Sequence, residues 1–358
     1  MKKIMLYPFN EEFIPLINHC NMLQNMDIVS IVSLKGNGYL GDKYTLKGKL
    51  VEVSEDFDMQ LKDCSDILCF TSGKEDIDKV IFLNVEKAVS CGKKIIFFDD
   101  LSLAFKKFKE LVPISQQVII PNLFTNSFET QGQLYNINTP VIFVCSAYEG
   151  LNKFDIQLAL RKSFLNANYR LLQIGTRQGC ELFNFHSFPK FMYDNTLTEK
   201  KKILLFNNWL KKLEIEYTPD IIILGISGGA IPFSAKAFGD FGITLYEILQ
   251  AVDPDCTILS LPYGKYEKED ILFWENFIKR KFNIEVDYYN IAPKVILKQS
   301  TESSGQPAYL RLDEKIVNTK IEELSMENIY NLLDVTEVKR LTKNIVDQFS
   351  KYGSINSV

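Results

Sequence analysis

The stretch VIFVCSAYEGLNKFDIQLALRKSF, residues 141 to 164, runs from an apolar strand pattern through a short polar loop and a lysine into an amphipathic helix pattern. This order is typical of a phosphate-binding loop, in which backbone N–H groups cradle phosphates and a hydroxyl after the lysine holds Mg²⁺. Lys153 is kept, but Ala147 and Asn152 replace the two glycines of such a loop. Phe154 replaces the hydroxyl residue. The stretch therefore predicts a degenerate P-loop-type layer, and it disfavours ordinary hydrolysis of a nucleoside triphosphate.

Lys153 is expected in the first turn of the helix, where unpaired N–H groups and the helix dipole favour an anion. The loop before it is polar and flexible because it contains Glu149, Gly150 and Asn152. We therefore favour a ligand or phosphate site made by Glu149, Gly150, Asn152 and Lys153 over an ordinary surface lysine near a helix end, which is the alternative.

Further strand and helix patterns alternate after this stretch, as expected for a parallel sheet covered by helices. The strand patterns are YRLLQIGT at 169–176, DIIILGIS at 220–227 and CTILSLPY at 256–263, and a long helix pattern covers 198–216. The strand pattern at 220–227 is followed by Gly228 and Gly229 rather than by a carboxylate that would hold Mg²⁺. These two glycines favour a close backbone approach to a ligand or another chain, and a tight turn without a ligand is the alternative.

The segment GTRQGCELFNFHSFPKFMYD, residues 175 to 194, interleaves polar residues with aromatic ones. Its position after a strand is where P-loop folds carry substrate or switch loops. Arg177, Glu181, His186 and Ser187 are therefore candidates for contacts to a second substrate or a peptide. A lone histidine among phenylalanines is more often a packed structural residue than a general base, so His186 has both interpretations.

The first half also alternates, with strand patterns IMLYPF at 4–9, DIVSIVSL at 27–34, DILCFTS at 66–72 and KKIIFFDD at 93–100. Val80, Leu83, Val85 and Ala88 repeat at helical spacing between the last two. This half is predicted to be a Rossmann-like domain. Asp99 and Asp100 stand at a strand end, and we favour a helix N-cap over a site for them.

A glycine-rich stretch, KGNGYLGDKYTLKG at 35–48, follows the second strand pattern of the first half. Gly36, Gly38 and Gly41 do not match the GxGxxG spacing of a dinucleotide site. The stretch leaves the carboxyl end of a strand, where doubly wound folds bind ligands. A plain mobile loop and a ligand or partner loop are both compatible with this pattern.

The fold class predicted is α/β with two doubly wound, Rossmann-like domains. Residues 1–110 form the first, 111–138 a connecting segment poor in charge, and 139–358 the degenerate P-loop-like domain with a C-terminal helical tail.

Composition excludes several classes of protein. The chain of 358 residues has a net charge of −4 and no apolar stretch long enough to span a membrane, so neither nucleic-acid binding nor a membrane span is expected. No signal-peptide pattern opens the sequence, so a cytoplasmic protein is expected. Seven scattered cysteines without a CxxC pair, and two histidines, predict no metal site and reduced thiols.

Five motifs together resemble a known family. They are YPFNEEFIPLINHCNML at 7–23, IVSLKGNGYLGD at 31–42, NKFDIQLALR at 152–161, IGTRQGCELFNFHSFPKFM at 174–192 and DIIILGISGG at 220–229. They are similar to the clostridial peptide maturation system proteins, which accompany radical SAM peptide maturases and small ribosomally made peptides. The resemblance extends over most of the chain, with FHSFP and the NKF form of the loop as its most specific parts. It implies a pathway more firmly than a reaction.

The C-terminal half is also distantly similar to dethiobiotin synthetase-like P-loop proteins, which bind ATP phosphates with a strand, loop and lysine. Asn152 and Phe154 depart from that pattern.

The leading hypothesis is therefore an accessory protein that binds a precursor peptide or its radical SAM maturase. A nucleotide-dependent ligase-like enzyme and a nucleotide sensor without turnover are the alternatives. No catalytic residue is assigned, and nucleotide is the cofactor class left open.

Overall fold

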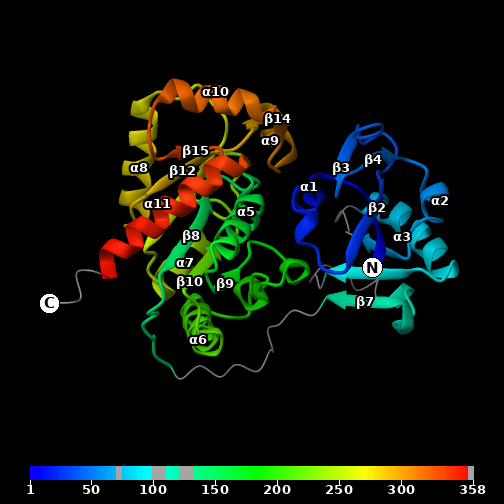
Figure 1. Ribbon diagram of the computed structural model, residues 1–358, viewed down its shortest axis with the longest axis horizontal. Coiled ribbons are helices and arrows are strands. Elements are labelled where there is room, and N and C mark those ends of the chain that lie inside the picture. Colours follow the sequence, from blue (N-terminus) through cyan, green and yellow to red (C-terminus); the bar gives the residue numbers. More distant parts are fainter. Residues whose placement is uncertain (70–74, 99–109, 121–131, 354–358) are drawn as a thin grey trace. The chain divides into compact units, whose positions relative to one another are not determined.

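The computed structural model describes residues 1–69, 75–98, 110–120 and 132–353. The chain forms two compact units (Figure 1). The first consists of Met1–Leu123 and Gln178–Phe185, and the second of Phe124–Arg177 and His186–Val358. The sequence pattern did not indicate that residues 178–185 belong to the first unit. Asp99 and Asp100 lie outside the described residues.

The first unit is built on a seven-stranded sheet in the order β3-β4-β2-β1-β5-β6-β7. All neighbouring strands are parallel except the antiparallel pair β3 and β4. The strands are β1 Lys2–Tyr7, β2 Met26–Val32, β3 Lys43–Leu46, β4 Lys49–Ser54, β5 Asp66–Cys69, β6 Lys94–Phe98 and β7 Gln117–Ile120. The helices are η1 Glu11–Phe13, α1 Ile14–Asn18, η2 Cys20–Met22, α2 Phe57–Gln60, α3 Glu75–Ser90 and η3 Ile114–Gln116.

Two details of this unit correct the sequence analysis. The glycine-rich stretch is not only a loop, because β3 and the start of β4 pair across a two-residue turn at Lys47 and Gly48, both with positive φ. The helix α3 was expected, but Val80 and Leu83 are exposed. Its buried face consists of Ile81, Val85 and Ala88.

The second unit is built on a six-stranded parallel sheet in the order β15-β12-β11-β8-β10-β9, with a separate antiparallel pair, β13 and β14. The strands are β8 Val141–Ser146, β9 Leu171–Ile174, β10 Ile221–Gly225, β11 Cys256–Leu261, β12 Tyr288–Ile291, β13 Lys294–Ile296, β14 Tyr309–Arg311 and β15 Ile329–Tyr330. The helices are α5 Lys153–Asn166, η4 Cys180–Phe183 (in the segment that counts with the first unit), η5 Lys190–Tyr193, α6 Glu199–Tyr217, α7 Ile243–Ala251, α8 Lys268–Phe282, α9 Lys298–Ser304, α10 Glu314–Leu324 and α11 Val335–Gly353.

The central strand β8 is buried at all six positions because helices cover both faces of the sheet. Val141, Phe143 and Cys145 pack in the larger core cluster with α6, α7 and α8. Ile142 and Val144 pack in a second cluster with α5 and α11, which lie on one face of the sheet in Figure 1. Both layers confirm the predicted α/β fold class.

The order of connections makes β8 a switch point. From β8 the chain runs to the edge strand β9, returns to β10 beside β8, and then crosses to β11 on the other side. In sheets of this kind ligands bind at the carboxyl end of the strands where the direction of winding reverses. The loop from Ala147 to Asn152 leaves β8 at that end.

Candidate functional site

The ammonium of Lys153, the first residue of α5, is directed into the protein. The residue is only 7% exposed, and its Nζ donates a hydrogen bond to the carbonyl oxygen of Gly228. The structure therefore brings together two regions that the sequence had indicated separately, the loop after β8 and the glycines after β10.

Gly228 and Gly229 are required by close approaches within the chain itself. A Cβ on Gly229 would lie 2.7 Å from the backbone nitrogen of Glu149 and 2.8 Å from the carbonyl carbon of Tyr148. Gly228 has a φ of +73°, and a Cβ there would lie 2.2 Å from Asp240 Oδ2. The backbone of Ala230 then donates to the Ser146 carbonyl at 2.9 Å. The space that the two glycines leave is thus filled by the loop after β8 and by a carboxylate.

Asp240 is a member of this site that the sequence analysis missed. Its Oδ1 accepts hydrogen bonds from the backbone N–H groups of Gly229 at 3.3 Å and Gly242 at 3.1 Å. Its Oδ2 is buried and has no hydrogen-bond partner among the described residues. The only sequence signal was its place between two glycines, Gly239 and Gly242, in a loop after β10.

Burial governs the charge of Lys153. It lowers the pKa of the ammonium to about 8, while the carboxylates of Glu149 and Asp240 act in the opposite direction. Burial also raises the pKa of the nearby Cys145 thiol to about 12, so this thiol is not a nucleophile at neutral pH.

The outer side of the loop is held by the antiparallel pair β13 and β14. Lys294 Nζ donates to the Gly150 carbonyl at 3.0 Å, and the Tyr309 hydroxyl donates to the Glu149 carbonyl. The ring of Tyr148 stacks on Phe233 with centroids 5.1 Å apart. These contacts hold the loop at Tyr148, Glu149 and Gly150.

The start of α5 differs from a phosphate site at the two positions flagged by the sequence. Asn152 takes the left-handed conformation, with φ of 55°, and its amide donates to Asp155 at 3.2 Å. Its Oδ1 is buried without a partner in the part of the chain that the structure describes. Phe154 is buried, and the Arg177 guanidinium lies 4.1 Å from its ring centroid. Arg177 therefore lies beside the loop, where it covers the aromatic ring that replaces the hydroxyl.

His186 and Ser187 are packed inside the second unit, with exposures of 6% and 2%. The imidazole meets Trp209 and Tyr217 edge to face, at centroid distances of 6.0 and 5.4 Å. Burial, with a smaller contribution from Arg161, lowers the pKa of His186 to about 4. His186 is thus a neutral ring in an aromatic cluster, and this geometry favours the structural interpretation. Glu181 belongs to η4, which counts with the first unit.

The glycine-rich loop of the first unit borders a pocket. Gly36, Gly38 and Gly41 all have φ near +80°, where glycine is the favoured residue. The Gly36 N–H donates to Glu55 Oε1 at 3.0 Å, and the Gly41 N–H donates to the Val53 carbonyl at 3.1 Å.

Two absences concern the described residues alone. No group of three or more His, Cys, Asp or Glu side chains there is arranged to hold a metal ion. None of the helices within 1–69, 75–98, 110–120 and 132–353 combines the length and the apolar character that crossing a membrane would require.

No family model and no curated protein matches the chain. Among solved structures, a DUF1611 family protein from Anabaena variabilis is similar at 10% identity, with 97% of this chain and 100% of that chain covered and a TM-score of 0.60. A plasmid partition protein from Borrelia burgdorferi shows 13% identity over 59% of this chain and 100% of its own, with a TM-score of 0.37. The MinD cell division protein of Aquifex aeolicus shows 10% identity over 58% and 98%, with a TM-score of 0.33.

The similarity to the DUF1611 family protein concerns the fold alone. The resemblance to the clostridial peptide maturation proteins stays a prediction.

Proposed function

We propose that this protein acts by binding rather than by hydrolysing nucleotides, as an accessory protein in the maturation of a ribosomally made peptide. Binding without hydrolysis is supported chiefly by one hydrogen bond, which the Lys153 ammonium donates to the carbonyl of Gly228 after β10. A P-loop lysine that served phosphates would have its ammonium directed at the ligand.

Three further features support binding without turnover. The hydroxyl that would hold Mg²⁺ is replaced by the buried ring of Phe154. The carbonyls of Glu149 and Gly150 are engaged by Tyr309 and Lys294, so the loop backbone is fixed before any ligand arrives. Phosphoryl transfer depends on positioning and on charge stabilisation by a lysine, a metal and backbone N–H groups. Here the lysine donates to a backbone carbonyl, and a phenyl ring stands where the metal-binding hydroxyl would be.

The pathway is supported by the family resemblance of the motifs at 152–161 and 174–192. The proposed partners are the precursor peptide and its radical SAM maturase. Co-purification of the tagged protein with the cognate peptide and maturase tests this proposal directly. Recovery of either partner at a defined stoichiometry supports the accessory role, and recovery of neither contradicts it.

A second candidate is a nucleotide sensor or a ligase-like enzyme. It is favoured by two buried polar atoms beside the Lys153 loop, Asn152 Oδ1 and Asp240 Oδ2, which lack partners among the described residues. Buried polar atoms of this kind normally meet a ligand, an ion or a water. They fit a polar ligand at the loop, and nucleotide is the class that the P-loop layout suggests.

Calorimetry with ATP, with and without Mg²⁺, separates the two candidates. Wild type is compared with Lys153→Ala and with the control Lys162→Ala, an exposed lysine on the same helix. Absence of binding in wild type supports the accessory role. Binding that is lost in Lys153→Ala but kept in Lys162→Ala favours the nucleotide candidate, and a phosphate-release assay then distinguishes a sensor from an enzyme.

A further inference from the structure

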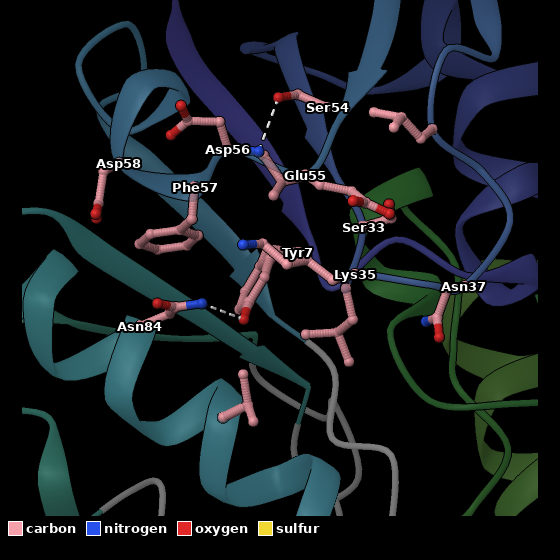
Figure 2. Close-up of a pocket in the computed structure, with 14 residues that line it drawn as sticks. Tyr7, Ser33, Lys35, Asn37, Ser54, Glu55, Asp56, Phe57, Asp58 and Asn84 are labelled. Atoms are coloured by element: carbon pink, nitrogen blue, oxygen red, sulfur yellow. Dashed lines mark hydrogen bonds between the residues drawn. The ribbon is translucent and has the colours of Figure 1, made fainter.

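The first unit contains a pocket of about 990 Å³ at the carboxyl ends of β1, β2 and β4 (Figure 2). Its wall also includes residues of α2 and α3. The chain leaves β1 for β2 and β4 on one side and later adds β5 on the other, so the pocket lies at a position where doubly wound sheets bind ligands. The Lys153 loop contributes no residue to it.

Ser33 marks this pocket as a site. The residue lines the pocket, is only 2% exposed, and its Oγ has no hydrogen-bond partner within the described chain. Its backbone N–H is bound to the Ser54 carbonyl at 2.9 Å, so the residue is held in place. A buried hydroxyl without a partner is energetically unfavourable, and a ligand that supplies the partner removes this cost.

Aromatic rings form the wall beside this hydroxyl. Tyr7 and Phe57 meet edge to face with centroids 4.7 Å apart, and Asn84 Nδ2 donates to the Tyr7 hydroxyl oxygen at 2.6 Å. Burial raises the pKa of Tyr7 to about 12, so its hydroxyl remains protonated at neutral pH. Faces of such rings attract cations.

The charged groups of the lining are three carboxylates and one ammonium. Glu55 is oriented by the Gly36 N–H at 3.0 Å, and Asp56 caps α2 through the Met59 N–H at 2.9 Å. The Asp58 carboxylate forms an ion pair at 2.9 Å with Lys87, a residue that does not line the pocket. Figure 2 shows the side chain of Lys35 extending into the pocket in the direction of Tyr7.

We propose that this pocket binds a protonated primary amine, and that the Lys35 ammonium occupies the amine position while no ligand is bound. The Glu55 and Asp56 carboxylates supply the charge, the Ser33 hydroxyl accepts a hydrogen bond, and the two aromatic rings form the wall. The amine belongs to a lysine side chain of a peptide or to a free polyamine. This site is separate from the function proposed for the second unit and does not depend on it.

Calorimetry with three probes tests the ligand class. The probes are Nα-acetyl-lysine methylamide, its norleucine counterpart, which lacks the amine, and spermidine. The lysine compound or spermidine is expected to bind and the norleucine compound is not. Stronger binding of the lysine compound indicates a peptide, and stronger binding of spermidine a polyamine. Equal binding of the norleucine compound, or no binding of either amine at millimolar concentration, overturns the proposal.

Two substitutions in the pocket are expected to change the affinity for an amine in opposite directions. Glu55→Gln keeps an acceptor for the Gly36 N–H but removes the charge, and it is expected to weaken amine binding about tenfold. Lys35→Met removes the internal competitor, and it is expected to strengthen amine binding severalfold. The matched control is Glu52→Gln, an exposed carboxylate on β4 that pairs with Lys43 and lies outside the pocket. Weaker amine binding in Lys35→Met would contradict the placement of the Lys35 ammonium at the amine position, and equal losses in Glu55→Gln and Glu52→Gln would show a nonspecific effect of charge.

Ser33→Ala supplies a check that does not depend on charge. Removal of the unpartnered hydroxyl is expected to stabilise the ligand-free protein slightly and to weaken amine binding. A destabilised protein with unchanged binding would remove Ser33 from the site and contradict the argument.

Discussion

The carboxyl ends of the central strands are treated differently in the two units. In the second unit, Lys294 and Tyr309 hold the loop after β8 through its carbonyls. The Lys153 ammonium donates an internal hydrogen bond to the Gly228 carbonyl. In the first unit, the corresponding edge of the sheet opens into a pocket with an unpartnered hydroxyl at Ser33. Both sheets are doubly wound with different strand orders, and the carboxyl end of the central strands is filled by the chain itself in one unit and open in the other.

The order of the strands thus decides where a ligand can bind, and the local chemistry decides whether it does. A strand end becomes a site when its polar groups are left for a ligand. At β8 the Lys153 ammonium and the carbonyls of Glu149 and Gly150 have partners within the chain, whereas Asn152 Oδ1 and Asp240 Oδ2 have none among the described residues. Four variants, one of them a double substitution, test this contrast between the two units.

Gly229→Ala is expected to have the largest effect. The new Cβ would lie 2.7 Å from the backbone nitrogen of Glu149, and neither backbone segment can give way cheaply. We expect a loss of about 3 kcal/mol in the free energy of unfolding, because overpacking against backbone forces both segments apart. Chemical denaturation measures this loss.

Gly36→Ala is the matched control in the first unit. It has a φ of +81°, but a Cβ there would meet nothing within 4 Å. Only the backbone penalty of about 1 kcal/mol is expected. Equal losses in the two variants would contradict the view that the second unit is closed at its strand end and the first is open.

Lys153→Met tests the internal use of the ammonium through pH. Burial lowers the pKa of Lys153 to about 8 in the folded state, against 10.5 as its ordinary value. Between these values the unfolded state binds more protons, so stability rises with pH. Wild type should therefore gain about 2 kcal/mol relative to Lys153→Met between pH 7 and pH 9.5, with little change below pH 7.

Urea unfolding of both proteins across this range measures the difference. Lys162→Met, at an exposed position of the same helix, should run parallel to wild type at all pH values. A Lys153→Met curve parallel to that of wild type would show that the ammonium is solvated and available to a ligand.

Much of this architecture was predictable, because it rests on periodicity. The buried strands VIFVCS and IIILG are apolar throughout, as strands covered on both faces must be, and their alternation with helices predicts parallel sheets. The positions of Lys153 and of Gly228 and Gly229 at strand ends followed from the same patterns. The motif at Phe154 was also sufficient to disfavour a Mg²⁺ site.

Other features depend on contacts between distant residues, which a single sequence does not show. Tyr309 reaches Glu149 over 160 positions, and Lys294 reaches Gly150 over 144. Asp240 stands in a loop without periodicity. The pocket lining joins Tyr7, Ser33, Glu55 and Asn84 from four elements or their ends. The glycine-rich loop was compatible with a ligand site and with a plain loop, and its sequence did not indicate the hydroxyl and carboxylates that line the pocket beside it.

Tyr309→Phe should loosen the loop after β8, with a smaller loss of stability than the two preceding variants. The ring remains, but the hydrogen bond to the Glu149 carbonyl is lost, which costs about 1 kcal/mol. Hydrogen exchange of the amides of Gly150, Leu151 and Asn152 should become faster, while the core strand β8 stays protected. Tyr246→Phe, at an exposed position on α7, serves as the control. Unchanged exchange in the loop would mean that β14 does not hold it.

Restoring the P-loop residues should have the smallest effect. Asn152→Gly combined with Phe154→Ser returns a glycine before the lysine and a hydroxyl after it, and the left-handed φ at position 152 suits glycine. We nevertheless expect no gain of Mg·ATP binding in calorimetry, because Lys153 still donates to Gly228 and the loop is still held by Lys294 and Tyr309. The control is the triple variant that also carries Tyr309→Phe. Of its three substitutions, only Tyr309→Phe removes a hydrogen bond to the loop backbone. Tight binding by the double variant would show that two side chains, and not the contacts of the whole loop, separate this strand end from a working phosphate site.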